Sequence, residues 1–267
     1  MQIAPLASTS PRAATLSPVP TPSPLPMDRA RPEVVAHRGV HDSTTLENTI
    51  EAYHRAATLG ADLVEVDIRR TADGVMVLHH DAWIAGRWIS RTNYADLPKL
   101  SNGRPIDTLQ GLVDAAAGAR GGPRLLIETK EFGYEADIVR TLRAGIDPSR
   151  FEFMSFKLDS VRALRQLAPD AKVGAVFGLI PDWKTGTWPI SGAAMVSRAR
   201  ELQVDFVAID RHIASNARLD ALAGAGIPTA IWTVNERSDL ERFLNDPRVF
   251  RVITDTPATA IGMLPPR

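Results

Sequence analysis

The stretch LVEVDI at residues 63–68 sets two acidic residues among apolar and β-branched ones, and it is one of eight short runs that decide the fold. Longer amphipathic stretches separate these runs, which is the pattern of strand–helix units around a parallel sheet. The eight predicted strands span residues 34–37, 63–68, 124–128, 151–155, 172–177, 205–209, 229–234 and 251–254.

Predicted helices fill the intervals between these strands. Apolar residues recur three and four positions apart in residues 48–59, 109–119, 136–144, 158–167, 193–202, 217–225 and 236–244. A doubly wound sheet usually stops at about five to seven strands, whereas eight strand–helix units close on themselves. The sequence therefore predicts a (β/α)8 TIM barrel, in which chemistry takes place at the carboxyl ends of the strands.

Residues 75–80 form one more extended run, which does not fit this alternation. Only residues 71–74 separate it from the strand at 63–68. A parallel crossover needs about a dozen residues or more, so the chain must return antiparallel. The sequence thus predicts a small hairpin inserted after the second barrel strand.

The register of this hairpin determines which side chains face one another. A two-residue turn at Asp73-Gly74 places Asp67 opposite His80, and a shift of the turn centre by one residue places Glu65 opposite His80 instead. Because strand side chains alternate between faces, both registers put Glu65, Asp67 and His80 on one face. His79 is expected to point away.

The composition limits the function classes. The 267 residues include 31 Lys and Arg, 31 Asp and Glu, and no cysteine. A balanced charge without a basic stripe argues against a nucleic-acid partner. The lack of cysteine removes disulfides, thiolate zinc sites and thiol nucleophiles. No apolar run approaches the roughly 20 residues that cross a bilayer, so we expect a cytoplasmic protein without a stable membrane anchor.

The first residues differ from the rest of the chain. Residues 1–26 hold seven of the 20 prolines and many Ser, Thr and Ala residues, with Arg12 as their only charge. They cannot bury a core and they lack the apolar region of a secretory signal, so we expect a disordered tail over 1–26 and one barrel domain over 27–267. Translation from Met27 is a hypothesis that the intact mass of the protein from its native host tests.

Three acidic residues end the second and third predicted barrel strands: Glu65, Asp67 and Glu128. Buried carboxylates repel one another, and a divalent cation is the simplest remedy. An all-oxygen ligand set suits Mg²⁺ or Ca²⁺. The alternative is a structural ion network, in which the acids pair with Lys130, Arg38 or Arg69.

The tripeptide His37-Arg38-Gly39 ends the first predicted strand. It suits a proton-transfer group beside a phosphate clamp, although a histidine there is otherwise a hydrogen-bonded core residue. Convergence favours the functional interpretation, because His37, His80, Arg38, Lys130 and the three acids are all expected at one barrel mouth.

The chain resembles the glycerophosphodiester phosphodiesterase family over residues 33–257. The resemblance rests on an ordered set of motifs: AHRG at 36–39, ENT at 47–49, EVD at 65–67, DG at 73–74 with HD at 80–81, DTL at 107–109, ETK at 128–130, SF at 155–156, WTVN at 232–235 and ITD at 253–255. Each motif alone is weak, whereas the ordered set is specific.

The resemblance implies a barrel enzyme that hydrolyses glycerophosphodiesters to glycerol 3-phosphate and an alcohol. It implies one divalent cation, Mg²⁺ or Ca²⁺, and a histidine pair that moves protons, with His37 assigned as base and His80 as acid. The implied roles are cation ligands at Glu65, Asp67 and Glu128, an acid/base pair at His37 and His80, phosphate binding by Arg38 and Lys130, and a pocket lined by Phe156 and Trp232.

The chain departs from the family pattern at two places. Leu46 stands where the family often has proline, and residues 82–88 read AWIAGRW in place of a polar, threonine-rich stretch. Trp83 and Trp88 predict either an apolar wall or lid beside the site, or a cover for the hairpin. Trp183 and Trp188 are likewise expected to fold either over a substrate or over the barrel rim.

Two other functions remain open. The first is release of the head-group alcohol from lysophospholipids, which an apolar groove of Trp83, Trp88 and Trp183 would favour. The second is a catalytically silent barrel that binds phosphorylated ligands. Both histidines and all three acids are present, and a binder needs no acid/base pair.

Overall fold

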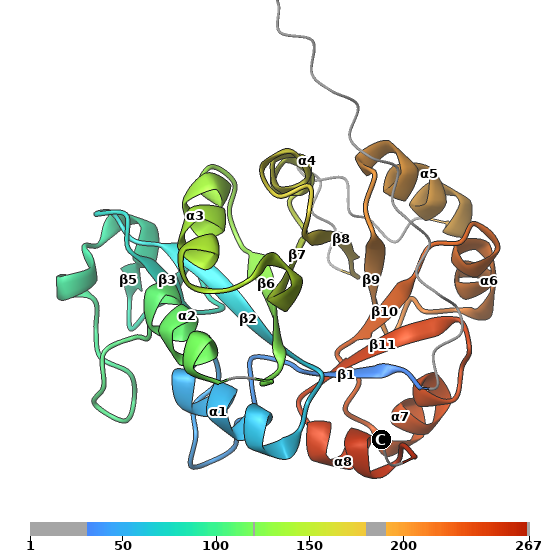
Figure 1. The fold of residues 1–267 in the computed structure, drawn as a ribbon, viewed down its shortest axis with the longest axis horizontal. Helices are drawn as coiled ribbons and strands as arrows, with labels where there is room; N and C mark the ends of the chain where they lie inside the picture. Colours follow the sequence, from blue (N-terminus) through green and yellow to red (C-terminus); the bar gives the residue numbers. More distant parts are fainter. Residues whose placement is uncertain (1–30, 120, 180–190, 266–267) are drawn as a thin grey trace, which may run out of the picture.

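The computed structural model describes residues 31–119, 121–179 and 191–265, and these form the closed barrel that the sequence predicts (Figure 1). The predicted tail over residues 1–26 lies outside the described residues. Eight parallel strands close into a barrel because β1 pairs with both β2 and β11. They are β1 (Glu33–Ala36), β2 (Leu63–Arg70), β6 (Arg124–Thr129), β7 (Phe151–Ser155), β8 (Lys172–Phe177), β9 (Phe206–Asp210), β10 (Thr229–Trp232) and β11 (Val249–Thr254).

Helices surround the strands (Figure 1). In the described residues they are α1 (Ile50–Leu59), α2 (Leu109–Gly118), α3 (Glu135–Gly145), α4 (Leu158–Leu167), α5 (Gly192–Leu202), α6 (Asn216–Gly224), α7 (Arg237–Leu244) and the short α8 (Pro257–Gly262). Helix α1 begins two residues later than predicted because Asn48 has a φ of 54° and Thr49 is the N-cap, accepting a hydrogen bond from the Ala52 amide at 3.1 Å. None of the described helices is both long enough and apolar enough to cross a bilayer.

The predicted hairpin is present, but its turn has three residues rather than two. β3 (Met76–Leu78) pairs antiparallel with β2. The Thr71 amide donates to the Val75 carbonyl at 2.9 Å, and Gly74 ends the loop with a φ of 87°. The Thr71 hydroxyl favours this longer turn by bonding to the Asp73 carboxylate at 2.5 Å and accepting from the Val75 amide at 2.9 Å.

Both predicted registers are therefore wrong by one residue. Ile68 lies opposite Leu78, and the His79 amide donates to the Asp67 carbonyl at 3.0 Å. Strict alternation from this register would place His79, not His80, on the face of Asp67. The strand ends at Leu78, however, so the alternation does not extend to either histidine.

The barrel interior has an apolar middle. Every second residue of the strands points inward, and the side chains at mid-height are Val35, Leu63, Leu126, Met154, Val176, Phe206, Ala208, Ala230 and Ile253. Phe156 and Trp232 pack on this layer. A second, larger apolar core lies between the strands and the helices. The middle layer separates two groups of charged side chains at the two ends of the barrel.

The group at the amino-terminal ends of the strands is called here the basal ion network: Glu33, Arg124, Glu152, Lys172 and Arg251. Arg251 is fully buried and reaches Glu33 at 2.7 Å and Glu152 at 2.9 Å. Arg124 pairs with both acids, and Lys172 lies 3.6 Å from Glu152. Three cations thus surround two carboxylates.

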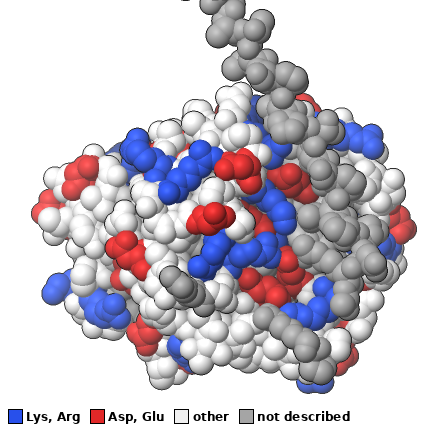
Figure 2. All heavy atoms as spheres, viewed as in Figure 1, with Lys and Arg blue, Asp and Glu red and all other residues white. Residues whose placement is uncertain are grey.

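The connection from β3 to α2 carries a second hairpin. It consists of β4 (Trp83–Ile84) and β5 (Arg87–Trp88), followed by short 3-10 turns at Ile89–Arg91 and Tyr94–Asp96. Buried Ile89 and Ile106 pack with Val77 and anchor this segment to the barrel. On the molecular face shown in Figure 2, Lys and Arg side chains lie among Asp and Glu side chains.

Candidate active site

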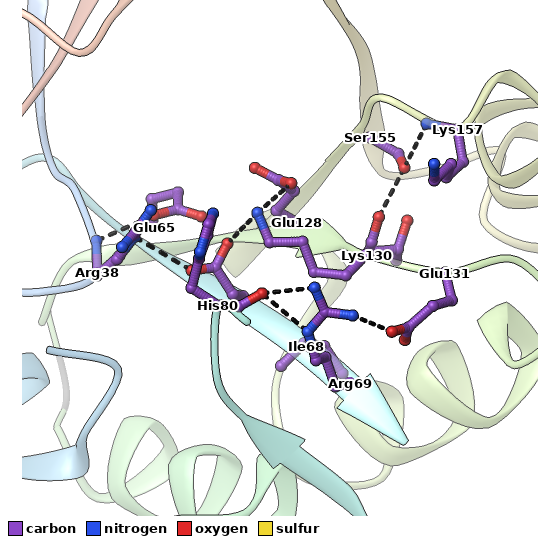
Figure 3. Close-up of polar contacts among 12 residues, drawn as sticks. Arg38, Glu65, Ile68, Arg69, His80, Glu128, Lys130, Glu131, Ser155 and Lys157 are labelled. Carbon is purple, nitrogen blue, oxygen red and sulfur yellow. Dashed lines mark hydrogen bonds and ion pairs between the residues drawn. The ribbon is translucent and has the colours of Figure 1, made fainter. Parts of the chain in front are cut away.

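Three buried carboxylates meet at the carboxyl-terminal mouth of the barrel. Glu65 and Asp67 point inward from β2, and Glu128 points inward from β6, where it is the register partner of Asp67. One oxygen from each of the three lies within 4.8 Å of the others. We call these three residues the acidic triad. Figure 3 shows Glu65 and Glu128 gathered with Arg38, His80 and Lys130.

Two cations contact the acidic triad. Lys130 Nζ lies 2.7 Å from Asp67 Oδ1 and 2.5 Å from Glu128 Oε1, and Arg38 Nε lies 3.3 Å from Asp67 Oδ2. Burial opposes protonation of Lys130, but the charges of Glu128 and Asp67 outweigh burial and raise its pKa. Both cations therefore stay charged and lie chiefly against Asp67 and Glu128.

Glu65 is left without a cation in hydrogen-bond contact. Its Oε2 accepts the Arg38 backbone amide at 2.9 Å, and its buried Oε1 has no hydrogen-bond partner. Burial, followed by the charges of Asp67 and Glu128, raises the pKa of Glu65 well above its ordinary value. Burial also opposes ionisation of Asp67, but Lys130 and Arg38 hold its pKa below the ordinary value.

The residues present fit a divalent cation. A fully buried carboxylate oxygen without a donor, close to two further carboxylates, provides the all-oxygen set that Mg²⁺ and Ca²⁺ prefer. Of the pairings expected in a structural ion network, those of Lys130 and Arg38 with the acids are present. Arg69 does not pair with these acids, because it pairs with Glu131 and donates to the His80 carbonyl. Three acids against two cations leave room for one more positive charge.

His37 follows β1 directly and has a defined partner. Its Nδ1 lies 2.6 Å from Asp255 Oδ1, and its Nε2 lies 3.9 Å from Glu65 Oε2. Asn235 holds the other oxygen of Asp255 by donating to Oδ2 at 2.6 Å. Burial opposes ionisation of Asp255, but hydrogen bonds from His37 and His41 lower its pKa. The contact fixes the His37 ring and directs Nε2 toward the acidic triad.

His41 shares this carboxylate. Its Nε2 lies 3.4 Å from Asp255 Oδ1, and the proximity of this carboxylate raises the pKa of His41. The described structure thus gives Asp255 three polar neighbours, of which His37 is the one that also faces the acidic triad.

His80 reaches the mouth by a bend of the chain rather than by strand alternation. Arg69 holds the backbone by donating to the His80 carbonyl at 2.8 and 2.6 Å (Figure 3). His80 Nδ1 lies 2.8 Å from Asp81 Oδ1. Burial and then the charge of Lys130 lower the pKa of His80, although Asp67 opposes them. His79 instead turns to the Asp81 carbonyl.

The loop after β1 is shaped by two consecutive left-handed residues. Arg38 has a φ of 55° and Gly39 a φ of 84°. A Cβ on Gly39 would lie 2.6 Å from the Cβ of Ala52, so only glycine lets this loop pack against α1. The bend turns the Arg38 side chain toward Asp67 and Glu47, whose Oε1 accepts from Arg38 Nη1 at 2.9 Å.

Asn48 also uses a left-handed conformation to support the site. Its Nδ2 donates to Asp67 Oδ2 at 2.8 Å, while its Oδ1 accepts the Asp67 amide at 2.9 Å. This reciprocal pair fixes the Asp67 carboxylate and its backbone together. Asn48 lies in the ENT motif and Asp255 in the ITD motif, yet neither was predicted from the sequence as a site residue. Their positions at the ends of predicted elements were the only indication of a role.

Phe156 follows β7 and Trp232 ends β10, so both lie at the same mouth. Their rings meet edge to face, with centroids 5.4 Å apart. Trp232 Nε1 is buried without a hydrogen-bond partner. A Cβ on Gly178 would lie 3.2 Å from the Trp232 ring, so the absence of a side chain there gives the indole its space.

A pocket of about 400 Å³ adjoins the site on the His80 side. Its walls include Leu46, Leu78, Ile84 and Leu100, with Lys99 and Ser101 also on the lining. The predicted wall or lid of Trp83 and Trp88 is not a lining of this pocket, and both indoles are half exposed. Trp183 and Trp188 lie outside the described residues.

The comparisons with known proteins agree with this geometry. Residues 37–259 match the model of the glycerophosphoryl diester phosphodiesterase family. A glycerophosphodiester phosphodiesterase from Caldanaerobacter subterraneus is 28% identical over 86% of this chain and 97% of its own. A probable glycerophosphodiester phosphodiesterase 2 from Mycobacterium tuberculosis is 29% identical over 83% and 86%.

Solved structures share the fold. The crystal structure of a glycerophosphodiester phosphodiesterase from Parabacteroides distasonis has a TM-score of 0.75 at 25% identity and covers 88% of this chain and 97% of its own. A phosphodiesterase from Oleispira antarctica, solved in complex with its product sn-glycerol-3-phosphate, has a TM-score of 0.71 at 21% identity, over 87% and 96%.

The sequence-based expectations of a closed (β/α)8 barrel and of an enzyme of this class are confirmed by the topology and by these matches. The family model spans most of the chain, from His37 to residue 259, and so includes every predicted site residue. The chain belongs to the glycerophosphoryl diester phosphodiesterase family.

Proposed function

We propose that the protein hydrolyses glycerophosphodiesters to glycerol 3-phosphate and an alcohol. One observation carries the proposal: the acidic triad, with oxygens within 4.8 Å of one another, shares a barrel mouth with two cations and two carboxylate-bonded histidines. The names of the curated relatives and the product bound by the Oleispira protein support the choice of substrate and product.

Arg38 and Lys130 would bind the phosphodiester. A transition state of phosphoryl transfer spreads negative charge over the non-bridging oxygens, and fixed cations stabilise that charge. Both side chains already lie at the mouth, Lys130 between Asp67 and Glu128, and Arg38 beside Asp67. A divalent cation held by the acidic triad, Mg²⁺ or Ca²⁺, would add Lewis-acid stabilisation of the same charge.

His37 is assigned as the general base. Its Nδ1 faces Asp255, so Nδ1 carries the proton and Nε2 is free to accept one. In the proposed course, Nε2 takes the proton of the glycerol hydroxyl that attacks phosphorus, giving a cyclic phosphate that water then opens. This arrangement repeats the orienting role of a carboxylate behind a catalytic histidine.

His80 is assigned as the general acid that protonates the leaving alcohol oxygen. Burial and Lys130 lower the pKa of His80 in the free enzyme. A bound phosphodiester places a negative charge next to both groups and so favours the protonated imidazole. His80 also lines the pocket of about 400 Å³, which gives the leaving alcohol a place on the side of its proton donor.

Phe156 and Trp232 would hold the glycerol moiety. Their edge-to-face pair forms one wall of the mouth, and the unpartnered Trp232 Nε1 is a free donor for a hydroxyl or phosphate oxygen. Aromatic walls with a few placed donors are typical of sites for small polar ligands.

The test is release of glycerol 3-phosphate from glycerophosphocholine by the purified protein, with added Mg²⁺ or Ca²⁺ and after chelation. We expect release that depends on the cation and returns when the cation is restored. No release with either cation, in a protein with a normal melting temperature, would contradict the proposal and favour a silent phosphate-binding barrel.

A lysophospholipase D type activity is the second candidate, because the pocket next to His80 has apolar walls of Leu46, Ile84 and Leu100. The two activities differ in the group attached to glycerol, an acyl chain or a hydroxyl. The ratio of kcat/KM for glycerophosphocholine and lysophosphatidylcholine distinguishes them. We expect the ratio to favour glycerophosphocholine, and the reverse order would assign the second activity.

A further inference from the structure

Exposed apolar side chains gather on the face of the barrel that holds the site. Among the described residues, five large apolar side chains are substantially exposed: Trp83, Trp88, Phe132, Leu167 and Leu179. Four of them lie in connections that follow the carboxyl ends of β2, β6 and β8. Only Leu167, at the end of α4, lies toward the opposite face. Single exposed apolar residues are ordinary, whereas neighbouring ones, such as Trp83 and Trp88, can form an interaction surface.

The two tryptophans are presented by a tight hairpin. Trp83 and Trp88 are directly opposite one another across β4 and β5, and each is 53% exposed. The turn between them, Ala85-Gly86, has two positive φ angles, 43° and 82°, as a two-residue hairpin turn requires. The indoles are therefore held together at the surface, and they do not serve as a buried cover for the first hairpin.

Phe132, which is 60% exposed, lies in the connection after β6, the strand that pairs with β2. Arg69 donates to the His80 carbonyl and pairs with Glu131 (Figure 3). Arg69 thus links His80, which precedes the hairpin, to Glu131, which precedes Phe132.

The charge of this segment differs from that of the whole chain. Residues 82–101 contain Arg87, Arg91 and Lys99 but only one acid, Asp96, whereas the chain as a whole is neutral. Arg91 lies 5.9 Å over the Trp88 ring. Within the described residues, neither Arg87 nor Arg91 has an acidic side chain within ion-pair distance. Their charges remain available to an external anion.

We propose that this surface docks on an anionic phospholipid layer. The surface, called here the interfacial face, consists of Trp83, Trp88, Phe132, Arg87 and Arg91. Indole rings prefer the boundary between headgroups and acyl chains, and nearby arginines add attraction to anionic headgroups. The combination of aromatic side chains and unpaired cations fits a lipid surface better than an apolar or acidic protein patch.

Docking would bring the site to the lipid. The hairpin contributes Ile84 and Ala85 to the pocket that also includes His80, so the pocket mouth lies beside the interfacial face. An alcohol or acyl moiety of a lipid-derived phosphodiester would then enter from the surface. This consequence rests on the proposed function, whereas the docking itself does not.

Sedimentation with vesicles tests the docking. The full chain is mixed with vesicles of phosphatidylcholine alone or of phosphatidylcholine with phosphatidylglycerol. We expect binding to the anionic vesicles, weakened about tenfold or more in Trp83→Ser/Trp88→Ser. The variant Arg87→Gln/Arg91→Gln should bind both kinds of vesicle equally weakly. The matched control is Leu167→Ser, which changes an exposed apolar residue on the other face and should bind like the wild type.

Three results would overturn the proposal. These are equal vesicle binding by the wild type and Trp83→Ser/Trp88→Ser, no preference of the wild type for anionic vesicles, and a dimer without vesicles that the tryptophan substitutions dissociate. Turnover of soluble glycerophosphocholine should be unchanged in every one of these variants, which shows that they are folded. If the wild type turns over no phosphodiester, melting temperatures replace this control, and the docking is still tested.

Discussion

The basal ion network and the acidic triad lie at opposite ends of one barrel and are built from the same kinds of side chain, but their charge balance differs. In the basal ion network three cations surround Glu33 and Glu152. At the other end two cations face three buried carboxylates. The apolar middle layer separates the two groups, so neither can compensate the other at contact distance.

The difference appears in the ionisation of the carboxyl groups. Burial opposes ionisation of Glu152, but Arg251, Lys172 and Arg124 outweigh it and lower its pKa. Burial and neighbouring acids raise the pKa of Glu65. Removal of one partner from a buried network of paired charges is strongly destabilising, whereas a buried acid without a cation costs stability and is a candidate for cation binding. The comparison thus separates structural from functional charge.

Replacement of a site histidine should have the largest effect and should leave the structure intact. We expect His80→Ala and His37→Ala each to lower kcat by a factor of ~10² to 10⁴, because each removes one positioned proton transfer. The free energy of unfolding should change little in His80→Ala, because its ring is partly exposed, and should fall in His37→Ala, which removes the hydrogen bond to Asp255. Steady-state turnover of glycerophosphocholine and urea denaturation measure the two quantities.

His212→Ala is the matched control. His212 also bonds a carboxylate, Asp210, at 2.8 Å, but it is exposed and makes no contact with the acidic triad. Its replacement should leave kcat unchanged. Normal turnover by His80→Ala would refute the acid/base assignment.

Replacement of Arg251 should lower stability and leave turnover unchanged. We expect Arg251→Met to lower the free energy of unfolding by about 3 kcal/mol, because it leaves Glu33 and Glu152 buried with fewer cations. The folded fraction should retain wild-type kcat. Urea denaturation with a turnover assay checks this, and a loss of kcat without a loss of stability would erase the distinction between the two ends.

Stabilisation by a divalent cation should depend on the acidic triad and not on the basal ion network. At about 100 times its Kd, Mg²⁺ or Ca²⁺ should raise the free energy of unfolding by about 2.7 kcal/mol. Glu65→Gln should abolish most of this gain, whereas Glu152→Gln should retain it even though it weakens the basal ion network. Thermal melts with and without the cation measure the gain. An equal gain in Glu65→Gln would place the cation elsewhere.

The contributions of Glu65 and Glu152 to the pH dependence of stability should have opposite signs. In metal-free protein, folded Glu65 keeps a proton that the unfolded chain releases above about pH 4.5, because its folded pKa is raised. Unfolding free energy should therefore fall as pH rises from about 4.5 toward the raised pKa, by at most about 1.4 kcal/mol per unit. Glu65→Gln should remove this slope.

The contribution of Glu152 has the reverse sign. Its folded pKa is lowered, so its stabilisation is present above its ordinary value of 4.5 and is lost as pH falls through the folded pKa. Glu152→Gln should flatten the acid side of the stability curve and should lower its neutral side without changing the slope there. Urea denaturation of the wild type and the two variants across the pH range isolates the two contributions, and contributions of the same sign would contradict the comparison.

The elements that the sequence predicts well are those with a local signal. Strands such as Phe151–Ser155 and helices such as Leu158–Leu167 have the predicted bounds, because alternation and three-to-four spacing are properties of neighbouring residues. The acidic triad was also predictable, since the carboxyl ends of adjacent parallel strands share one mouth. The hairpin register was not, because the Thr71 hydroxyl stabilises a three-residue turn that the Asp73-Gly74 pair does not signal.

The sequence did not predict the hydrogen bonds that site residues form with residues of distant elements. Nothing near His37 indicates that Asp255 will bind it, and nothing near Asp67 indicates the reciprocal contact with Asn48. The exposure of Trp83 and Trp88 was equally hidden, because a tryptophan in a sequence is as compatible with a buried wall as with a surface. Long-range pairing and burial depend on the closed barrel as a whole.

The pairing of His37 with Asp255 determines when during translation of the chain this part of the site can form. The two residues are 218 positions apart and flank the first and last barrel strands, which pair with each other. Because β11 is synthesised long after β1, a nascent or truncated chain that lacks β11 has neither a closed barrel nor a His37 held by Asp255. The proposed general base is therefore oriented only after the chain has been translated through Asp255.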